Sequence, residues 1–257
     1  MQIVMVGAGR LATQLGWALK EAGHDVVAVW SRTMESAEML ASQLGATATN
    51  ELQRLPLQAD VFVVSVKDVA LESVVDEAVK GRGKQLFLHT AGSMAMSIFH
   101  GKTTRYGVLY PMQTFSKERR VDFTQIPVFI EASDIETQSV VRCLAESVSE
   151  KVQELSTEDR KYLHLAAVFA CNFTNHCYDL AAKVLESHGM SFDVMLPLVD
   201  ETARKVHELA PHEAQTGPAV RYDENVISMQ AEMLKEFPAL KDIYERMSLS
   251  IFQSFHD

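Results

Sequence analysis

Short apolar runs alternate with amphipathic segments along the first half of the chain. Several runs are continuously apolar and rich in β-branched residues, as strands buried on both faces are. Between them, segments at 11–22, 34–44 and 69–80 carry helical periodicity, and each lies beside a glycine turn. The predicted strands cover residues 3–6, 26–30, 61–66, 85–89, 107–110 and 128–131. This alternation predicts an α/β fold with a mostly parallel sheet.

The second half of the chain is predicted to be almost wholly helical, because no strand pattern follows residue 134. The sequence Ser156-Thr157-Glu158-Asp159 has the form of a helix capping box with Ser156 as N-cap. Glycine and proline residues divide the rest into separate helices. The predicted helices cover 134–148, 157–187, 191–209, 223–235 and 239–254. We therefore expect two domains, over residues 1–153 and 154–257.

The composition argues against several classes of protein. The 257 residues are 47% hydrophobic and 23% charged, and no apolar run approaches the ~20 residues of a membrane span. A net charge of −10 without a Lys/Arg block argues against a nucleic-acid partner. The start of the chain lacks the features of a signal peptide, so a cytoplasmic location is expected. Three cysteines without zinc-site spacing predict reduced thiols and no metal site: Cys143, Cys171 and Cys177.

A phosphate-binding turn is predicted directly after the first strand. The sequence there is Gly7-Ala8-Gly9-Arg10-Leu11-Ala12, a G-x-G-x-x-A pattern that opens a helix. Gly7 allows a tight turn, Gly9 lets the backbone approach a pyrophosphate, and Ala12 lets the helix pack on the strand. The helix N-terminus then offers N–H groups and a positive dipole to the anion. This context predicts a Rossmann dinucleotide-binding domain over residues 1–153, although a glycine-rich turn without a nucleotide would have the same pattern.

The end of the second predicted strand favours NADP(H) over NAD(H). An NAD site usually places Asp or Glu there to accept hydrogen bonds from the ribose 2′-hydroxyl. This strand instead ends Trp30-Ser31-Arg32-Thr33. Arg32 can pair with a 2′-phosphate while Ser31 and Thr33 donate their hydroxyls. The alternative is that Ser31 or Thr33 caps the next helix and Arg32 is a solvated surface charge.

Further candidate residues follow the next two predicted strands, because ligands of open α/β sheets lie beyond the carboxyl ends of the strands. The loops after the predicted strands 61–66 and 85–89 should flank the nicotinamide and the substrate. We assign Ser93 to the substrate, and Tyr110 to Phe115 form a third candidate wall. The serine and threonine side chains are equally compatible with helix capping. The cofactor-binding candidates in these loops are Ser65, Val66, Thr90, Ala91 and Gly92.

A polar stripe is predicted on the long helix of the second domain, at helical i, i+3, i+4 and i+7 spacing within apolar sequence. Buried polar groups need hydrogen-bond partners, which a cleft or a subunit contact would supply. A single histidine such as His164 is also compatible with a core or surface position. Arg221, which precedes another predicted helix, is a candidate for contact with an anionic substrate or cofactor group. The stripe consists of Asn172, Asn175, His176 and Asp179.

Taken together, these motifs resemble a bacterial family that joins a Rossmann-like NADP oxidoreductase domain to a helical C-terminal domain of unknown function. The resemblance covers nearly the whole chain. More distantly, the chain is similar to pyrroline-5-carboxylate reductase and to the β-hydroxyacid and 6-phosphogluconate dehydrogenases. The resemblance implies a helical domain of the 6-phosphogluconate dehydrogenase C-terminal-like type, which commonly dimerises. The residues that carry it are Gly7-Ala8-Gly9, Ser31-Arg32-Thr33, His89 to Ser93, Tyr110 to Phe115, Asn172, and Thr216 to Asp223.

One position departs from those dehydrogenases. They place a catalytic lysine one helical turn before an asparagine, and if Asn172 is that asparagine, the lysine position holds Val168. Valine cannot transfer a proton. Acid–base work would then fall to His164, to His176 or to a water held by Asn172, unless the reaction needs none or has been lost.

The leading functional hypothesis is an NADP(H)-dependent oxidoreductase that transfers a hydride to or from a small, anionic keto acid, hydroxy acid or imine. In this hypothesis Asn172, His176 and His164 are the catalytic candidates, and Ser93, Asn175 and Arg221 bind substrate. Val168 motivates the alternative, a non-catalytic NADP(H)-binding or redox-sensing module. A third possibility is an interaction scaffold with a vestigial nucleotide site. The abundant apolar surface of the helices predicts a homodimer through the C-terminal domain.

Overall fold

The computed structural model describes residues 1–256 and contains two compact units, an α/β unit (Met1–Cys171) and a helical unit that begins at Asn172. Within its described residues, the α/β unit has one eight-stranded sheet in the order β3-β2-β1-β4-β5-β6-β7-β8. All neighbouring strands are parallel except β6 and β7. The strands are β1 (Gln2–Val6), β2 (Asp25–Trp30), β3 (Thr47–Thr49), β4 (Val61–Val64), β5 (Leu86–His89), β6 (Arg105–Pro111), β7 (Val128–Ala132) and β8 (Val152–Glu154).

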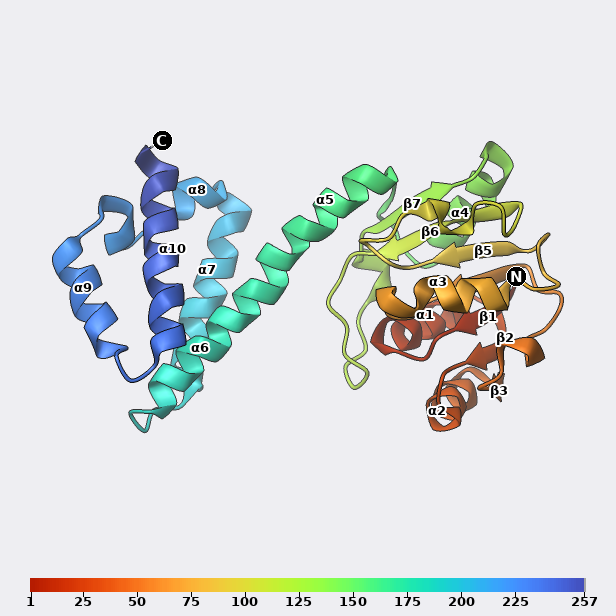
Figure 1. The fold of residues 1–257 in the computed structure, drawn as a ribbon, viewed down its shortest axis with the longest axis horizontal. Coiled ribbons are helices and arrows are strands. Elements are labelled where there is room, and N and C mark those ends of the chain that lie inside the picture. The colour runs from red at the N-terminus through yellow and green to blue at the C-terminus, as the bar shows by residue number, and fades with distance from the viewer. Residues whose placement is uncertain (257) are drawn as a thin grey trace. The chain divides into compact units, whose positions relative to one another are not determined.

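Helices cover both faces of this sheet, which is the Rossmann-like arrangement (Figure 1). On one face, α1 (Arg10–Glu21), α2 (Met34–Leu44) and α4 (Ile135–Glu146) bury their apolar stripes. On the other face, α3 (Asp68–Ala78) and the short helices η1 (Leu52–Arg54) and η2 (Met96–Phe99) complete a second core. The third short helix, η3 (Phe123–Gln125), precedes β7. The α/β fold with a mostly parallel sheet is therefore confirmed.

The sequence pattern missed two short strands. β3 (Thr47–Thr49) and β8 (Val152–Glu154) contain only three residues each, too few for a clear alternation of apolar and polar positions. Both lie at the edges of the sheet. The prediction that no strand follows residue 134 is wrong for β8, which pairs with β7 from Val128 to Ile130.

The helix predicted over 157–187 has three parts. α5 (Thr157–Ala167) leads into a π-helical segment, η4 (Val168–Phe173), and α6 (Thr174–Glu186) follows. Ser156 is the N-cap, and its hydroxyl oxygen accepts a hydrogen bond from the Asp159 backbone N–H at 3.1 Å. The Ser156 hydroxyl donates in turn to the Asp159 carboxylate at 2.6 Å, so the pair forms a local variant of the predicted capping box.

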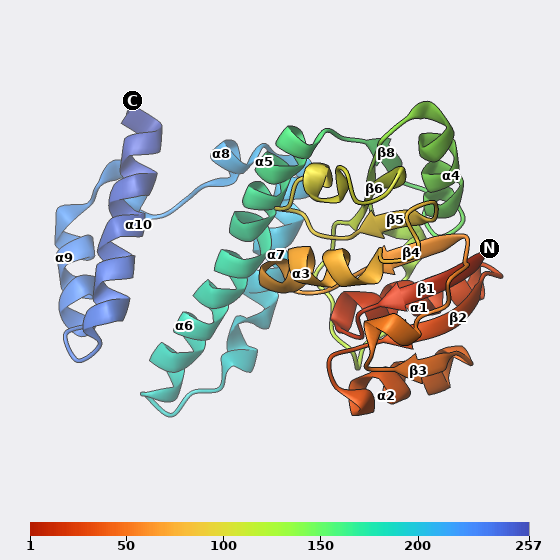
Figure 2. The same cartoon turned by 45° about the vertical axis from the view of Figure 1, so that its right-hand side comes forward.

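The helical unit contains the C-terminal helices that the sequence predicts, and Figure 2 shows α9 beside α10. Pro238, predicted to separate two helices, is the first residue of α10, a position that tolerates a missing N–H. The sequence analysis did not predict the short helices α8 and η6. The elements after α6 are η5 (Phe192–Met195), α7 (Leu196–Glu208), α8 (Pro211–Ala214), η6 (Pro218–Arg221), α9 (Glu224–Met233) and α10 (Pro238–His256).

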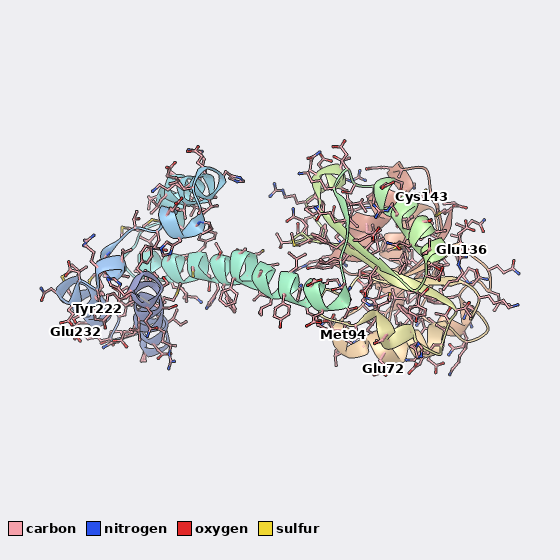
Figure 3. All side chains as sticks on the ribbon, turned by 90° about the horizontal axis from the view of Figure 1, so that it is seen from above. Glu72, Met94, Glu136, Cys143, Tyr222 and Glu232 are labelled. Atoms are coloured by element: carbon pink, nitrogen blue, oxygen red, sulfur yellow. The ribbon has the colours of Figure 1, made fainter. Side chains whose placement is uncertain are left out.

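The compact units divide between Cys171 and Asn172, whereas the sequence predicts a boundary after residue 153. The difference arises because α5 packs on the sheet. Arg160, in the second turn of α5, is 1% exposed and pairs with Glu131 of β7. Its guanidinium also donates to the Met94 carbonyl, and Figure 3 shows Met94 beside the beginning of this helix. Residue 153 lies in β8, the last strand of the sheet.

Candidate functional site

The predicted phosphate-binding turn lies between β1 and α1. Gly7 has a φ of +131°, and a Cβ there would overlap the Ser65 carbonyl, so only glycine fits. Gly9 is the N-cap of α1, and a Cβ there would meet no atom within 4 Å. The space over Gly9 is open to a ligand. Ala12 is fully buried in the core between α1 and the sheet. Each of these three positions has the geometry that dinucleotide binding needs.

Arg32 lies just beyond the carboxyl end of β2, in the loop before α2. Its side chain is exposed and has no ion pair within the described part of the chain. Thr33 is the N-cap of α2, but its hydroxyl donates to the Ser36 hydroxyl at 2.9 Å instead of capping the helix. Ser31 is half-buried, and its backbone N–H donates to the Thr49 carbonyl. This loop therefore offers one guanidinium and two hydroxyls to an anion, and no carboxylate among residues 31–33.

The loops after β4 and β5 lie beside this turn. Ser65 is buried against Gly7, and Thr90 donates its backbone N–H to the Val64 carbonyl. Val66 and Ala91 are half-buried and pack against the core cluster on one face of the sheet. Ser93 has a different partner, since its hydroxyl donates to the Asp68 carboxylate at the first turn of α3. The Ser93 side chain therefore stabilises the loop, and its substrate contact stays a prediction.

Gly92 brings the β5 loop against a tyrosine–histidine pair. A Cβ on Gly92 would come within 2.5 Å of His164 Nδ1 and 3.0 Å of Tyr110 Cζ. The Tyr110 hydroxyl, at the end of β6, and His164 Nδ1, on α5, are hydrogen bonded at 2.9 Å. Burial raises the pKa of Tyr110, and the nearby Arg160 charge opposes this only in part. The phenol is thus protonated at neutral pH and linked to a half-buried imidazole.

A buried ion pair fixes the helix that carries His164. Arg160 Nη1 lies 2.5 Å from Glu131 Oε2, and Thr157 donates to the same oxygen at 2.7 Å. Arg160 Nη2 donates to the Met94 carbonyl at 2.6 Å. His164 follows Arg160 by one helical turn. The Arg160–Glu131 ion pair therefore sets the position of His164 over Gly92. The sequence analysis missed both partners, because their separation along the chain leaves no local pattern.

His89 at the end of β5 is structural. Its ring is fully buried, stacks on Phe99 and accepts the Ala91 backbone N–H at Nδ1. Burial, and to a lesser extent the Arg160 charge, lower the pKa of His89 to about 3. The neutral ring therefore holds the loop that leads to Gly92 and carries no charge at neutral pH.

The other predicted site residues belong to the helical unit. Asn172, Asn175 and His176 are all exposed in the single chain, so the cleft or subunit contact expected to cover this polar stripe stays a prediction. Asp179 pairs with Lys183 at 2.6 Å, which lowers its carboxyl pKa. Arg221 is exposed at the end of η6. Their predicted contacts with substrate stay predictions.

The α/β unit thus has the parts of a dinucleotide site at the carboxyl ends of its parallel strands. The glycine turn and the Arg32 loop fit a dinucleotide, since Gly7 makes the tight turn against Ser65 and the space over Gly9 is open. The Tyr110–His164 pair can supply a proton beside the β5 loop. These features define a Rossmann-like protein with a candidate dinucleotide site.

Two family matches cover most of the chain. Residues 2–101 match the family described as NADP oxidoreductase coenzyme F420-dependent, and residues 126–251 match a domain of unknown function, DUF2520. The chain is 51% identical to the protein BF3122 from Bacteroides fragilis, named as a candidate NADP oxidoreductase, with 98% of each chain covered and a TM-score of 0.95. The chain belongs to this family of NADP oxidoreductase domains joined to a DUF2520 domain. The predicted resemblance is therefore confirmed.

More distant solved structures share the fold. An imine reductase from Myxococcus stipitatus in complex with NADP+ is 14% identical, with 100% of this chain and 93% of that chain covered and a TM-score of 0.69. A 1-pyrroline-5-carboxylate reductase from Streptococcus pyogenes is 17% identical, with 98% of each chain covered and a TM-score of 0.66. No curated protein sequence matches the chain significantly. Among the described residues, no helix combines the length and the apolar character that crossing a membrane requires.

Proposed function

We propose that the protein is an NADP(H)-dependent reductase of a small metabolite with a C=N or C=O group, anionic in character. The observation that carries the proposal is the glycine turn beside the unpaired Arg32, at the sheet edge where Gly92 meets Tyr110 and His164. The family match to NADP oxidoreductases supports the cofactor, and imine and pyrroline-5-carboxylate reductases of the same fold support the substrate class.

In this proposal the turn and Arg32 bind the cofactor. The backbone N–H groups at the start of α1 hold the pyrophosphate, and Arg32 pairs with the 2′-phosphate. When bound, the cofactor supplies a hydride from its nicotinamide. The loops that contain Ser65 and Thr90 hold the nicotinamide side of the site in place, since both side chains are buried and fixed by the strands.

The Tyr110–His164 pair supplies the proton. Reduction adds a hydride to the substrate carbon, the π-electron pair moves to the nitrogen or oxygen, and that atom takes a proton. The Tyr110 hydroxyl donates it, and His164 returns a proton to Tyr110 from solvent. The phenol is protonated at neutral pH because its ordinary pKa is 10.0, and burial raises that pKa. This assignment gives a proton donor to a chain that has Val168 at the lysine position. Asn172, Asn175, His176 and Arg221 are proposed to complete substrate binding.

Loss of NADPH absorbance with a panel of cyclic imines and 2-keto acids tests the proposal. Tyr110→Phe should lower kcat by about a hundredfold, the lower range for general acid catalysis, and leave NADPH affinity unchanged. Tyr162→Phe is the matched control, since Tyr162 is a 68% exposed tyrosine on the same helix as His164. NADPH binding without turnover of any substrate would instead favour a non-catalytic NADP(H)-binding or redox-sensing module.

A further inference from the structure

The chain between β6 and η3, residues 112–122, is fixed across α1. Gln14 of α1 is 3% exposed, and its amide Nε2 donates to the carbonyls of Ser116 at 2.7 Å and Arg119 at 2.8 Å. Its Oε1 accepts the Val121 backbone N–H at 3.3 Å. A buried amide that bonds three backbone groups of one segment holds that segment in a single place.

A second set of contacts fixes the outer end of the 112–122 segment. The Arg120 guanidinium lies 4.7 Å from the centre of the Trp17 ring and pairs with Glu21 at 2.7 Å. Phe115 stacks on Phe123 with ring centres 6.1 Å apart. Both contacts belong to the α/β unit, so the segment and the cofactor turn are parts of one body.

The 112–122 segment closes one side of a cavity of about 270 Å³ beside the glycine turn. Ala8 of the turn and Thr13 of α1 line one wall, and Ser36 of α2 lines another. Lys117 and Glu118 line the third wall. The cavity therefore lies between α1, α2 and the segment, and Trp17, Met39, Leu40 and Gln43 complete its lining.

The polar groups of this cavity suit an anion. Lys117 is half-buried and has neither an ion pair nor a hydrogen bond in the described part of the chain. The Ser36 hydroxyl, which accepts from Thr33, keeps its own proton free for donation. Through Ser36 the cavity is linked to Thr33, which follows Arg32, the residue expected to bind the 2′-phosphate. The Glu118 carboxylate is exposed and can turn to solvent.

We infer that Lys117 is a second cation for the 2′-phosphate of NADP(H), delivered by the 112–122 segment to the cavity between α1 and α2. The inference rests on the proposed function, and it assigns cofactor specificity to a residue far along the chain from Arg32. Two cations and the hydroxyls of Thr33 and Ser36 would surround one phosphate, the arrangement that phosphate recognition favours. Gln14 acts as a positioning residue, because it holds the segment that carries Lys117.

Calorimetric titration with NADP+ and NAD+ tests this inference. Lys117→Ala should weaken NADP+ binding about tenfold, as loss of a charge-assisted contact does, and leave NAD+ binding unchanged. Lys117→Arg should retain most of the NADP+ affinity. The matched control is Lys84→Ala, because Lys84 is exposed and lies before β5, at the amino end of the parallel strands. Thermal unfolding of each variant checks that the fold is intact.

The possible outcomes distinguish the role of Lys117 from the proposed function. An equal loss of NADP+ and NAD+ affinity in Lys117→Ala would place the lysine on the pyrophosphate and overturn the inference. Unchanged NADP+ affinity in Lys117→Ala, together with a loss in Arg32→Ala, would overturn the inference and leave the proposed function standing. A parent protein that binds neither nucleotide would overturn both.

Discussion

At the residue scale, the local motifs of the cofactor site could be predicted from the sequence, and its proton-transfer pair could not. Gly7, Gly9 and Arg32 act through their immediate neighbours, so a short pattern identifies them. Tyr110 and His164 are 54 residues apart and meet only because β6 and α5 converge at Gly92. The sequence analysis named His164 as a catalytic candidate and Tyr110 as part of a candidate wall, but it had no signal that these two side chains pair.

Arg32 is expected to determine the cofactor preference together with Lys117. Arg32→Ala should cost ~1.5–3 kcal/mol of NADP(H) binding, roughly tenfold to a hundredfold in affinity, because a charge-assisted contact with the 2′-phosphate is lost. NAD(H) affinity should change little. Calorimetry on the parent and the variant measures both. Equal NADP(H) affinity in the parent and the variant would contradict the prediction that Arg32 binds the 2′-phosphate.

His89 is expected to make the fold sensitive to acid. Its pKa is about 3 in the folded protein, below the ordinary 6.5, because the ring is buried. Between these values the unfolded chain binds a proton that the folded protein does not, so this contribution to stability falls as the pH drops from about 6.5 towards 3. The free energy of unfolding should fall through His89 by at most about 1.4 kcal/mol per pH unit.

His89→Asn tests this pH dependence, since an amide oxygen can accept the Ala91 N–H as Nδ1 does. Urea unfolding at pH 7 and pH 5 should show a smaller loss of stability at pH 5 for the variant than for the parent. The same pH dependence in both proteins would mean that His89 does not titrate as its burial requires.

At the element scale, the sequence pattern predicts long helices and buried strands well and misses what depends on tertiary contacts. β1 and α1 were clear from periodicity, whereas β3 and β8 are edge strands of three residues. The π-helical segment η4 interrupts a helix that the periodicity predicts as continuous. Such segments depend on the packing around a helix and are often found at functional sites. Here η4 contains both Val168 and Asn172, which the sequence analysis singled out.

The Arg160–Glu131 pair is expected to anchor α5 to the sheet. Arg160→Met should lower the free energy of unfolding by about 3–5 kcal/mol, because it leaves the mostly buried Glu131 carboxylate without its cation. Adding Glu131→Gln should restore part of this loss. Denaturant titration measures the free energy. Arg142→Met is the control, since Arg142 pairs with Glu146 and Glu154 on the surface, where ion pairs contribute little.

At the scale of the whole molecule, the helical unit exposes many large apolar side chains. Val194 is 64% exposed, Leu198 of α7 is 62% exposed and Met233 of α9 is 69% exposed. By contrast, the large apolar side chains that the described part of this unit buries are few, Leu185 and Ile227 among them. Soluble proteins that expose extended apolar surface generally use it as an interface.

We expect a second copy of this chain to cover part of that surface, as the sequence analysis proposed. Light scattering at micromolar concentration should give about twice the chain mass of 28.6 kDa. Leu198→Lys should shift the protein towards the monomer, because it places a charge in a surface that dimerisation would bury. Ile135→Lys is the matched control: Ile135 is 82% exposed, but it lies on α4 of the α/β unit, so its change should leave the mass as it is in the parent. A parent protein that is monomeric at this concentration would contradict the prediction, and the exposed apolar residues of the helical unit would then require a different partner.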